Sequence, residues 1–141
     1  MSPILSILIA DDDIIFARQL KLAIEQRLSC ATRVHVCANP EGFFRDAARG
    51  WDIITLDYRD FAANNPEEYF DAARLHAKYV YLLTAESPYH PDRIYDRNKY
   101  DTMRFIGKNE VPNAGNLAEN LLDRARNDGF IRASHIKLSR K

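Results

Sequence analysis

Short apolar runs alternate with segments of helical spacing along the whole chain. The apolar runs are rich in β-branched and aromatic residues and end in polar ones, which is typical of strands. Those near the start and middle are almost continuously apolar, which predicts strands buried on both faces of a parallel sheet. Strands are expected at residues 4–10, 32–38, 51–57, 79–83 and 102–106.

Helical spacing fills the intervals between these runs. Asp12 or Asp13 can cap the first predicted helix, and Asn39 with Pro40 is a typical start for the second, which Gly50 stops. Pro88 and Pro91 force the fourth helix to begin late and stay short. Helices are expected at residues 14–28, 40–48, 67–77, 92–99 and 114–127.

Strictly alternating strands and helices favour one α/β domain. We predict a three-layer α/β/α sandwich of the flavodoxin-like (βα)5 type, with parallel strand order 2-1-3-4-5 and right-handed crossovers. A chain of 141 residues is long enough to bury a core of this kind. We assign residues 1–127 to this domain and residues 128–141 to a basic C-terminal tail.

Polar residues collect where the predicted strands end. Asp11 and Asp12 follow the first strand, Asp57 ends the third, Thr84 follows the fourth and Lys108 follows the fifth. Because the carboxyl ends of parallel strands share one edge of a sheet, these side chains should converge there. The loops expected at the opposite edge, residues 29–31 and 49–50, carry no comparable set.

This combination of charges suits phosphoryl chemistry. Crowded carboxylates repel one another, and Mg²⁺ relieves such repulsion with carboxylate, water and phosphate oxygens as ligands. Asp57 can act as a nucleophile that forms an aspartyl-phosphate. Lys108 and the Thr84 hydroxyl can each interact with a phosphoryl oxygen. The residues therefore predict a magnesium-dependent site of phosphoryl transfer.

Four motifs carry a resemblance to a known family. The segments ILIADDD, IITLD, YLLTAE and MRFIGK resemble, in order and approximate spacing, the strand ends of the receiver domain of two-component response regulators. The resemblance covers about residues 3–127. It implies that Asp57 accepts a phosphoryl group from a histidine kinase or a histidine phosphotransfer protein. It also implies Mg²⁺ ligands, which would be Asp11, Asp12, Asp57 and the backbone carbonyl of Arg59.

The resemblance further implies a conformational switch. Thr84 would move toward the phosphoryl group, Lys108 would pair with Asp57 or its phosphate, and Phe105 would swing inward as Thr84 moves. A downstream protein would then read the state on the surface formed by residues 92–99, 102–106 and 114–127. In physical terms this is a two-state element biased by contacts to phosphate.

Several positions depart from the family pattern. Lys108 is followed by Asn109 where the family usually has proline, which predicts a trans peptide bond there. Residues 59–63 replace the usual Met-Pro and Gly after the acceptor. Arg59 and Glu86 each lie two residues beyond a site residue, so we expect them to alter the lifetime of the phosphate, in a direction that the sequence leaves open.

The composition excludes several other classes of function. Lys plus Arg equals Asp plus Glu, 20 against 20, which gives no global attraction to nucleic acid or membrane. No secretory signal and no membrane-spanning run is apparent, so we expect a cytoplasmic protein in which Cys30 and Cys37 are reduced thiols. Three roles stay open for the basic tail at residues 128–141: a disordered end, a docking segment or linker, or an element used in homodimer formation.

Simpler interpretations stand beside each of these assignments. Asp11 and Asp12 could only favour a helix N-terminus, Asp57 could be a turn residue, and Phe105 could be an ordinary core aromatic. At the level of function, we expect a stand-alone switch that transfers phosphate to itself and is not an enzyme acting on a separate substrate. The alternatives are a receiver-like interaction module that is not phosphorylated and, less favoured, a small Mg²⁺-dependent phosphatase.

Overall fold

A single parallel sheet forms the middle layer of the protein. The computed structural model describes residues 5–28, 32–57, 66–84, 104–107, 114–127 and 129, and it describes the backbone alone at 66, 67, 84 and 104–107. The strands are β1 (Leu5–Ala10), β2 (Thr32–Cys37), β3 (Trp51–Asp57), β4 (Ala77–Thr84) and β5 (Arg104–Gly107). They are parallel throughout, in the order β2-β1-β3-β4-β5. The predicted fold class and strand order are confirmed.

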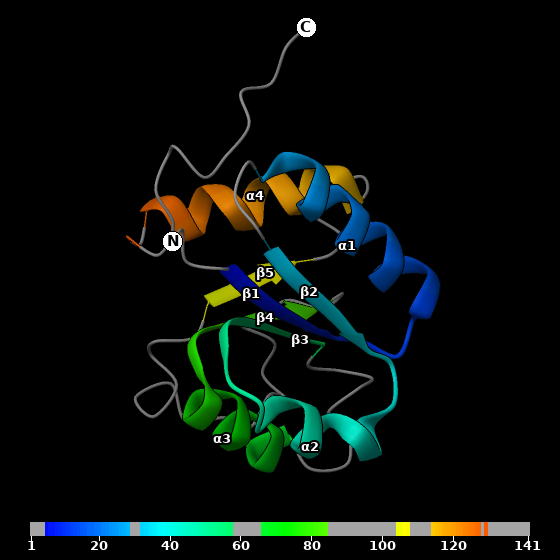
Figure 1. Ribbon diagram of the computed structural model, residues 1–141, viewed down its shortest axis with the longest axis vertical. Helices are drawn as coiled ribbons and strands as arrows, with labels where there is room; N and C mark the ends of the chain where they lie inside the picture. Colours follow the sequence, from blue (N-terminus) through cyan, green and yellow to red (C-terminus); the bar gives the residue numbers. More distant parts are fainter. Residues whose placement is uncertain are drawn as a thin grey trace, which may run out of the picture.

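Helices cover both faces of this sheet (Figure 1). Helices α1 (Ile14–Arg27) and α4 (Ala114–Asn127) lie on one face, and α2 (Phe43–Ala47) and α3 (Pro66–His76) lie on the other, with a short 3₁₀ turn at Pro40–Gly42 before α2. Among the described helices, none is long and apolar enough to cross a membrane.

Each face of the sheet has its own apolar core. Side chains such as Ile7, Ile9 and Ile53 point to the α1 and α4 side, while Leu8, Ile54 and Leu56 point to the α2 and α3 side. Because successive side chains of a strand point to opposite faces, β1 and β3 contribute to both cores. This burial on two sides explains why their sequences are almost continuously apolar.

The helix ends follow the local chemistry of the sequence. The Asp13 carboxylate caps α1 by accepting a hydrogen bond from the Phe16 amide at 3.1 Å. Asn39 caps the 3₁₀ turn in the same way, through the Glu41 amide at 3.0 Å. Gly50 has a φ of +85°, a conformation that favours glycine, and it lies between α2 and β3. The two predicted caps and the predicted stop are confirmed.

Element boundaries differ from the prediction in a few places. The second predicted helix is divided into the 3₁₀ turn and the short α2, and β4 begins at Ala77, directly after α3 ends at His76. Helical spacing puts Ile14 on the same face of α1 as the buried Ala17, but Ile14 is 42% exposed, as the first residue of the helix. The helix predicted at 92–99 and the tail at 128–141, except Gly129, lie outside the described residues.

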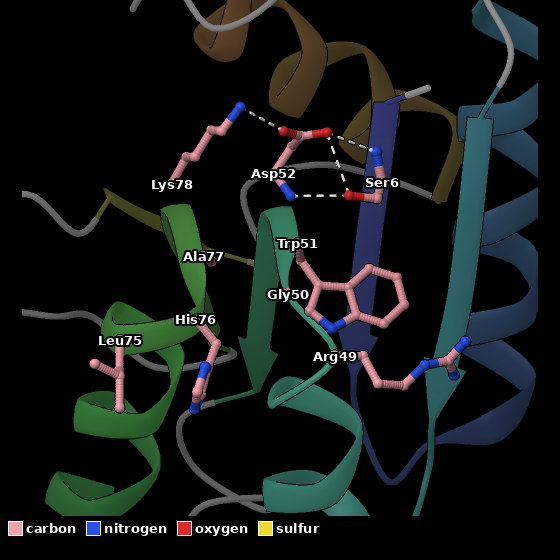
Figure 2. Close-up of a pocket in the computed structure, with 9 residues that line it drawn as sticks. All are labelled: Ser6, Arg49, Gly50, Trp51, Asp52, Leu75, His76, Ala77 and Lys78. Carbon is pink, nitrogen blue, oxygen red and sulfur yellow. Dashed lines mark hydrogen bonds and ion pairs between the residues drawn. The ribbon is translucent and has the colours of Figure 1, made fainter. Parts of the chain in front are cut away.

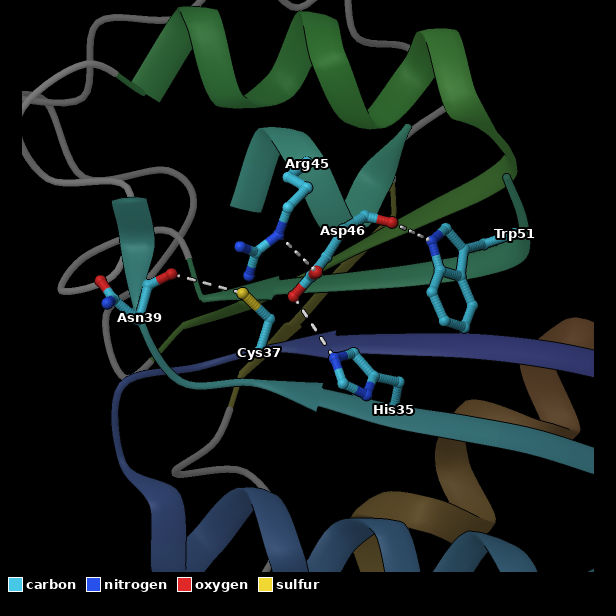
Figure 3. Close-up of polar contacts among 6 residues, drawn as sticks. All are labelled: His35, Cys37, Asn39, Arg45, Asp46 and Trp51. Atoms are coloured by element: carbon cyan, nitrogen blue, oxygen red, sulfur yellow. Dashed lines mark hydrogen bonds and ion pairs between the residues drawn. The ribbon is translucent and has the colours of Figure 1, made fainter. Parts of the chain in front are cut away.

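A buried carboxylate fastens α2 to the edge strand β2 (Figure 3). Oδ2 of Asp46 lies 3.3 Å from Nε2 of His35, and Oδ1 lies 3.5 Å from Nε of Arg45. The backbone carbonyl of Asp46 accepts a hydrogen bond from Nε1 of Trp51 at 2.8 Å, and the nearby Cys37 thiol donates to the Asn39 carbonyl at 3.3 Å. Such a short helix has little stability of its own, so these contacts hold it in place.

Cys37 is a free, buried thiol, as predicted, whereas Cys30 lies outside the described residues. Burial, together with the hydrogen bond to Asp46 and the negative charge of that carboxylate, raises the pKa of the Cys37 thiol to about 12. Because the thiolate is the reactive species, Cys37 should be protected from alkylation in the folded protein.

We expect iodoacetamide to label Cys37 at pH 8 roughly a thousandfold more slowly in native protein than in denaturant, where an ordinary thiol pKa of about 8.5 applies. Peptide mapping after timed quenching would measure both rates. Equal rates in the two conditions would contradict this prediction.

Candidate functional site

Strand register places the two buried acids of the site side by side. Ala10 of β1 pairs with Leu56 of β3, so the next residues, Asp11 and Asp57, both emerge at the carboxyl ends of neighbouring strands. Asp57 in turn pairs with Leu83 of β4. The site therefore follows directly from the parallel register of the central strands, as the sequence predicted.

Three carboxylates converge at this edge. One carboxylate oxygen from each of Asp11, Asp12 and Asp57 lies within 4.8 Å of the others. Asp11 and Asp57 are buried, 1% and 2% exposed, while Asp12 is exposed to solvent. The Asp13 amide donates to Oδ1 of Asp11 at 2.9 Å, which orients that carboxylate, and Asp13 itself serves as the α1 cap.

This group of oxygens fits a small hard cation. Neighbouring ligand oxygens around octahedral Mg²⁺ are about 3 Å apart and opposite ones about 4 Å apart, so small side-chain rotations would bring the three carboxylates into range. The ligands are all oxygen and all anionic, which suits Mg²⁺ and not a softer metal. The exposed Asp12 lies on the solvent side of the two buried acids, where water and phosphate oxygens can complete the coordination.

The other predicted site residues are described only in part. Thr84 ends β4, and its backbone pairs with Gly107 of β5, the residue before Lys108. Phe105 lies in β5 and pairs with Leu82. The side chains of Thr84 and Phe105 are not described, and Lys108 and Arg59 lie outside the described residues, as do Glu86 and the bond between Lys108 and Asn109. Their roles stay predictions.

The opposite edge of the sheet carries a polar group that the sequence reading missed (Figure 2). The Asp52 carboxylate accepts hydrogen bonds from the amide and the hydroxyl of Ser6, at 2.9 and 3.2 Å, and lies 3.1 Å from Nζ of Lys78. These residues border an open pocket of about 560 Å³. The prediction that this edge carries no comparable set therefore covers only its loops and is wrong for the strand ends beside them.

A signal for this group was present in the sequence. Ser6, Asp52 and Lys78 are each the second residue of an otherwise apolar strand, in β1, β3 and β4. Polar residues at matching positions of neighbouring strands come together once the register is known. The group links β1, β3 and β4 at their amino ends.

Comparisons of the sequence alone find no relative: no protein-family model matches the chain, and no curated protein sequence matches it.

Comparisons of the structure find many proteins of similar fold. The response regulator domain of Thermotoga maritima CheB superimposes with a TM-score of 0.68 at 18% identity, covering 89% of this chain and 96% of that one. Vibrio cholerae chemotaxis protein CheY4 gives 0.62 at 15% identity, with 86% and 98% covered. A CheY-like receiver domain protein from Methanospirillum hungatei gives 0.63 at 14% identity, with 90% and 98% covered. The chain therefore has the CheY-like fold of response regulator receiver domains, with an acidic cluster at the carboxyl edge of its sheet.

Proposed function

We propose that the protein is a signalling switch that accepts a phosphoryl group on Asp57. The observation that carries this proposal is the convergence of Asp11, Asp12 and Asp57 at the carboxyl edge of a receiver-type sheet. If Asp11 and Asp12 only favoured a helix N-terminus, no buried acid from β3 would be needed beside them. If Asp57 were only a turn residue, it would be exposed to solvent, whereas it is 2% exposed.

The proposed reaction is a direct displacement. A carboxylate oxygen of Asp57 attacks the phosphorus of a phospho-histidine on a histidine kinase or phosphotransfer protein. The new O–P bond forms as the N–P bond breaks, and the released imidazole takes up a proton. Mg²⁺ bound by the three acids and the Arg59 carbonyl would offset the negative charge that gathers on the phosphoryl oxygens.

The remaining proposed roles belong to residues near the same edge. Lys108 would pair with the phosphoryl group and the Thr84 hydroxyl would donate to it, which would draw Phe105 inward. The backbone positions of Thr84 and Gly107 support this part of the proposal, since their strands continue the row that contains Asp57. A downstream protein would detect the change on the surface that includes α4 and β5.

The phosphodonor must approach the carboxyl edge, and the first turn of α1 borders that edge. Ile14 and Ile15 follow the acidic run directly and are 42% and 69% exposed. Exposed apolar side chains beside a reactive group are typical of a surface that a partner covers. We therefore propose that the donor protein packs against this turn during transfer.

Incubation with Mg²⁺ and acetyl phosphate, followed by intact mass measurement, tests the proposed function. We expect an adduct of one phosphoryl group that maps to Asp57 and that fails to form in excess EDTA. If no adduct forms and no Mg²⁺ binds, the result would favour the interaction module. Turnover of phosphate esters with no stable adduct would favour the phosphatase.

A further inference from the structure

The indole of Trp51 is covered by basic side chains. The guanidinium carbon of Arg33 lies 4.3 Å from the centroid of the ring and that of Arg49 lies 5.8 Å from it. The imidazole of His35 stacks beside the indole, with centroids 6.2 Å apart and planes inclined by 17°. Trp51 itself is only 4% exposed, so the outer surface here is formed by Arg33, His35 and Arg49, which we call the Trp51 cluster.

The Arg33 guanidinium is held in place, and among the described residues neither guanidinium group has an acidic partner. Arg33 donates from its terminal nitrogen to the Gly50 carbonyl at 2.9 Å, and Figure 2 shows the Arg49 side chain running beside the indole. Both residues are exposed, and within the described part of the chain neither forms an ion pair. The nearby Asp46 carboxylate is engaged by His35 and Arg45.

The cluster is therefore a local excess of positive charge on a protein whose total charge is balanced. A guanidinium group fixed by an aromatic ring and a carbonyl, as that of Arg33 is, loses little conformational freedom when it binds an anion. Carboxylate is a matching anion, because it can accept two parallel hydrogen bonds from one guanidinium group.

The cluster also lies at an edge of the sheet. Among the described strands, β2 is the outermost one beside β1, and Arg33 and His35 occupy alternate positions of it, on the same face. An edge strand presents backbone N–H and C=O groups that an extended peptide can pair with. Backbone pairing and charge thus point to the same kind of ligand.

We propose that this edge of the sheet binds an extended acidic segment of a partner protein. The backbone of the segment would run along β2, and its carboxylates, carried at alternate positions, would lie on Arg33 and Arg49. A polynucleotide is less suited to this surface, since it lacks a pairing backbone and needs a wider field of positive charge than this neutral protein offers.

Trp51 is the only tryptophan of the chain, so its fluorescence reports directly on the cluster. The probe is a ten-residue peptide of alternating Thr and Glu, titrated into the full chain beside a peptide with Gln in place of Glu. We expect a saturable fluorescence change with the Glu peptide, binding at least about tenfold weaker with the Gln peptide, and loss of affinity as salt is raised.

Variants locate the binding on the surface. Arg33→Gln and Arg49→Gln should each weaken Glu-peptide binding at least about fivefold, while Arg18→Gln, an exposed arginine on α1, should bind like the wild type. Arg49 contacts only the ring, so its variant should fold, and circular dichroism would check this. Equal binding of both peptides, unchanged binding by both variants, or tighter binding of an oligothymidine that displaces the peptide would overturn the proposal.

Discussion

Replacing Asp57 with Asn is expected to abolish both the phosphoryl adduct and the stabilisation of the protein by Mg²⁺. The amide cannot act as the nucleophile, and it removes one of three anionic ligands from the group. Wild-type protein should gain about 2.7 kcal/mol of unfolding free energy at a Mg²⁺ concentration one hundred times its dissociation constant, and the variant should gain almost none. Thermal melts with and without Mg²⁺ would measure this difference.

The same variant should be more stable than the wild type when metal is absent. Asp57 is 2% exposed and lies near two other carboxylates, whose mutual repulsion is only weakly screened in such a site. We expect a gain of about 1–2 kcal/mol, smaller than a bare Coulomb energy because solvent reaches Asp12.

Asp13→Asn is the matched control for this experiment. It removes one charge from the same acidic run, but Asp13 caps α1 and is not one of the converging acids, and Asn is an equally good cap. It should keep the adduct and the Mg²⁺ response. An adduct on Asp57→Asn, or a loss of Mg²⁺ stabilisation in Asp13→Asn as large as that in Asp57→Asn, would contradict the proposed site.

Replacing Asp46 with Ala should lower the free energy of unfolding by about 2–4 kcal/mol. The change removes the hydrogen-bond partner of His35 and the ion-pair partner of Arg45, and it leaves a gap in a part-buried region. Asp46→Asn keeps the shape and one acceptor oxygen, so we expect a loss of about 1 kcal/mol. Urea unfolding followed by Trp51 fluorescence would measure the free energy of unfolding of both variants. Trp51 reports on this region because its Nε1 donates to the Asp46 carbonyl.

The contribution of Asp46 should also depend on pH. Burial acts to raise the pKa of this carboxyl, but the hydrogen bonds from Cys37 and His35 and the charges of His35 and Arg45 outweigh it, so the pKa in the folded state is lowered. Because the pKa of Asp46 is lower in the folded state, its ionised form stabilises the protein at pH values above the unfolded-state pKa of about 4. This stabilisation is lost as the pH falls through the folded-state pKa. The difference between wild type and Asp46→Asn should therefore shrink below about pH 4.

Asp123→Asn provides the control for both measurements. Asp123 is exposed on α4 and lies 3.8 Å from Arg126, an ion pair of the kind that contributes little in water. Its replacement should change stability by less than about 0.5 kcal/mol. If Asp123→Asn lost as much stability as Asp46→Ala, the loss would not be specific to the contacts of Asp46, because removal of any acid would destabilise the protein.

The order of elements, the fold class and the acidic cluster could all be predicted from the sequence. Strands buried on both faces are mostly apolar, as in β1 and β3, and this pattern does not depend on long-range contacts. Asp11 and Asp57 could be placed together because each follows an apolar run and parallel strands end at one edge. The caps at Asp13 and Asn39 depend only on neighbouring residues, so they too could be predicted.

Only the tertiary structure showed the polar groups that lie away from the carboxyl edge of the sheet. Ser6, Asp52 and Lys78 come from three strands, and their contact depends on a register that hydrophobic periodicity does not specify. Asp46 is a similar case. In the sequence it is an ordinary charged residue of a short helix, and only the packing of α2 against β2 places it beside His35 and Cys37. Arg33 and Arg49 both lie near the Trp51 ring because Arg33 reaches across from the edge strand β2 to the turn at Gly50. The sequence by itself thus determined the acidic edge of the sheet, whereas the basic surface around Trp51 was decided by packing, since residues 33–35 and 49–51 come together only in the folded chain.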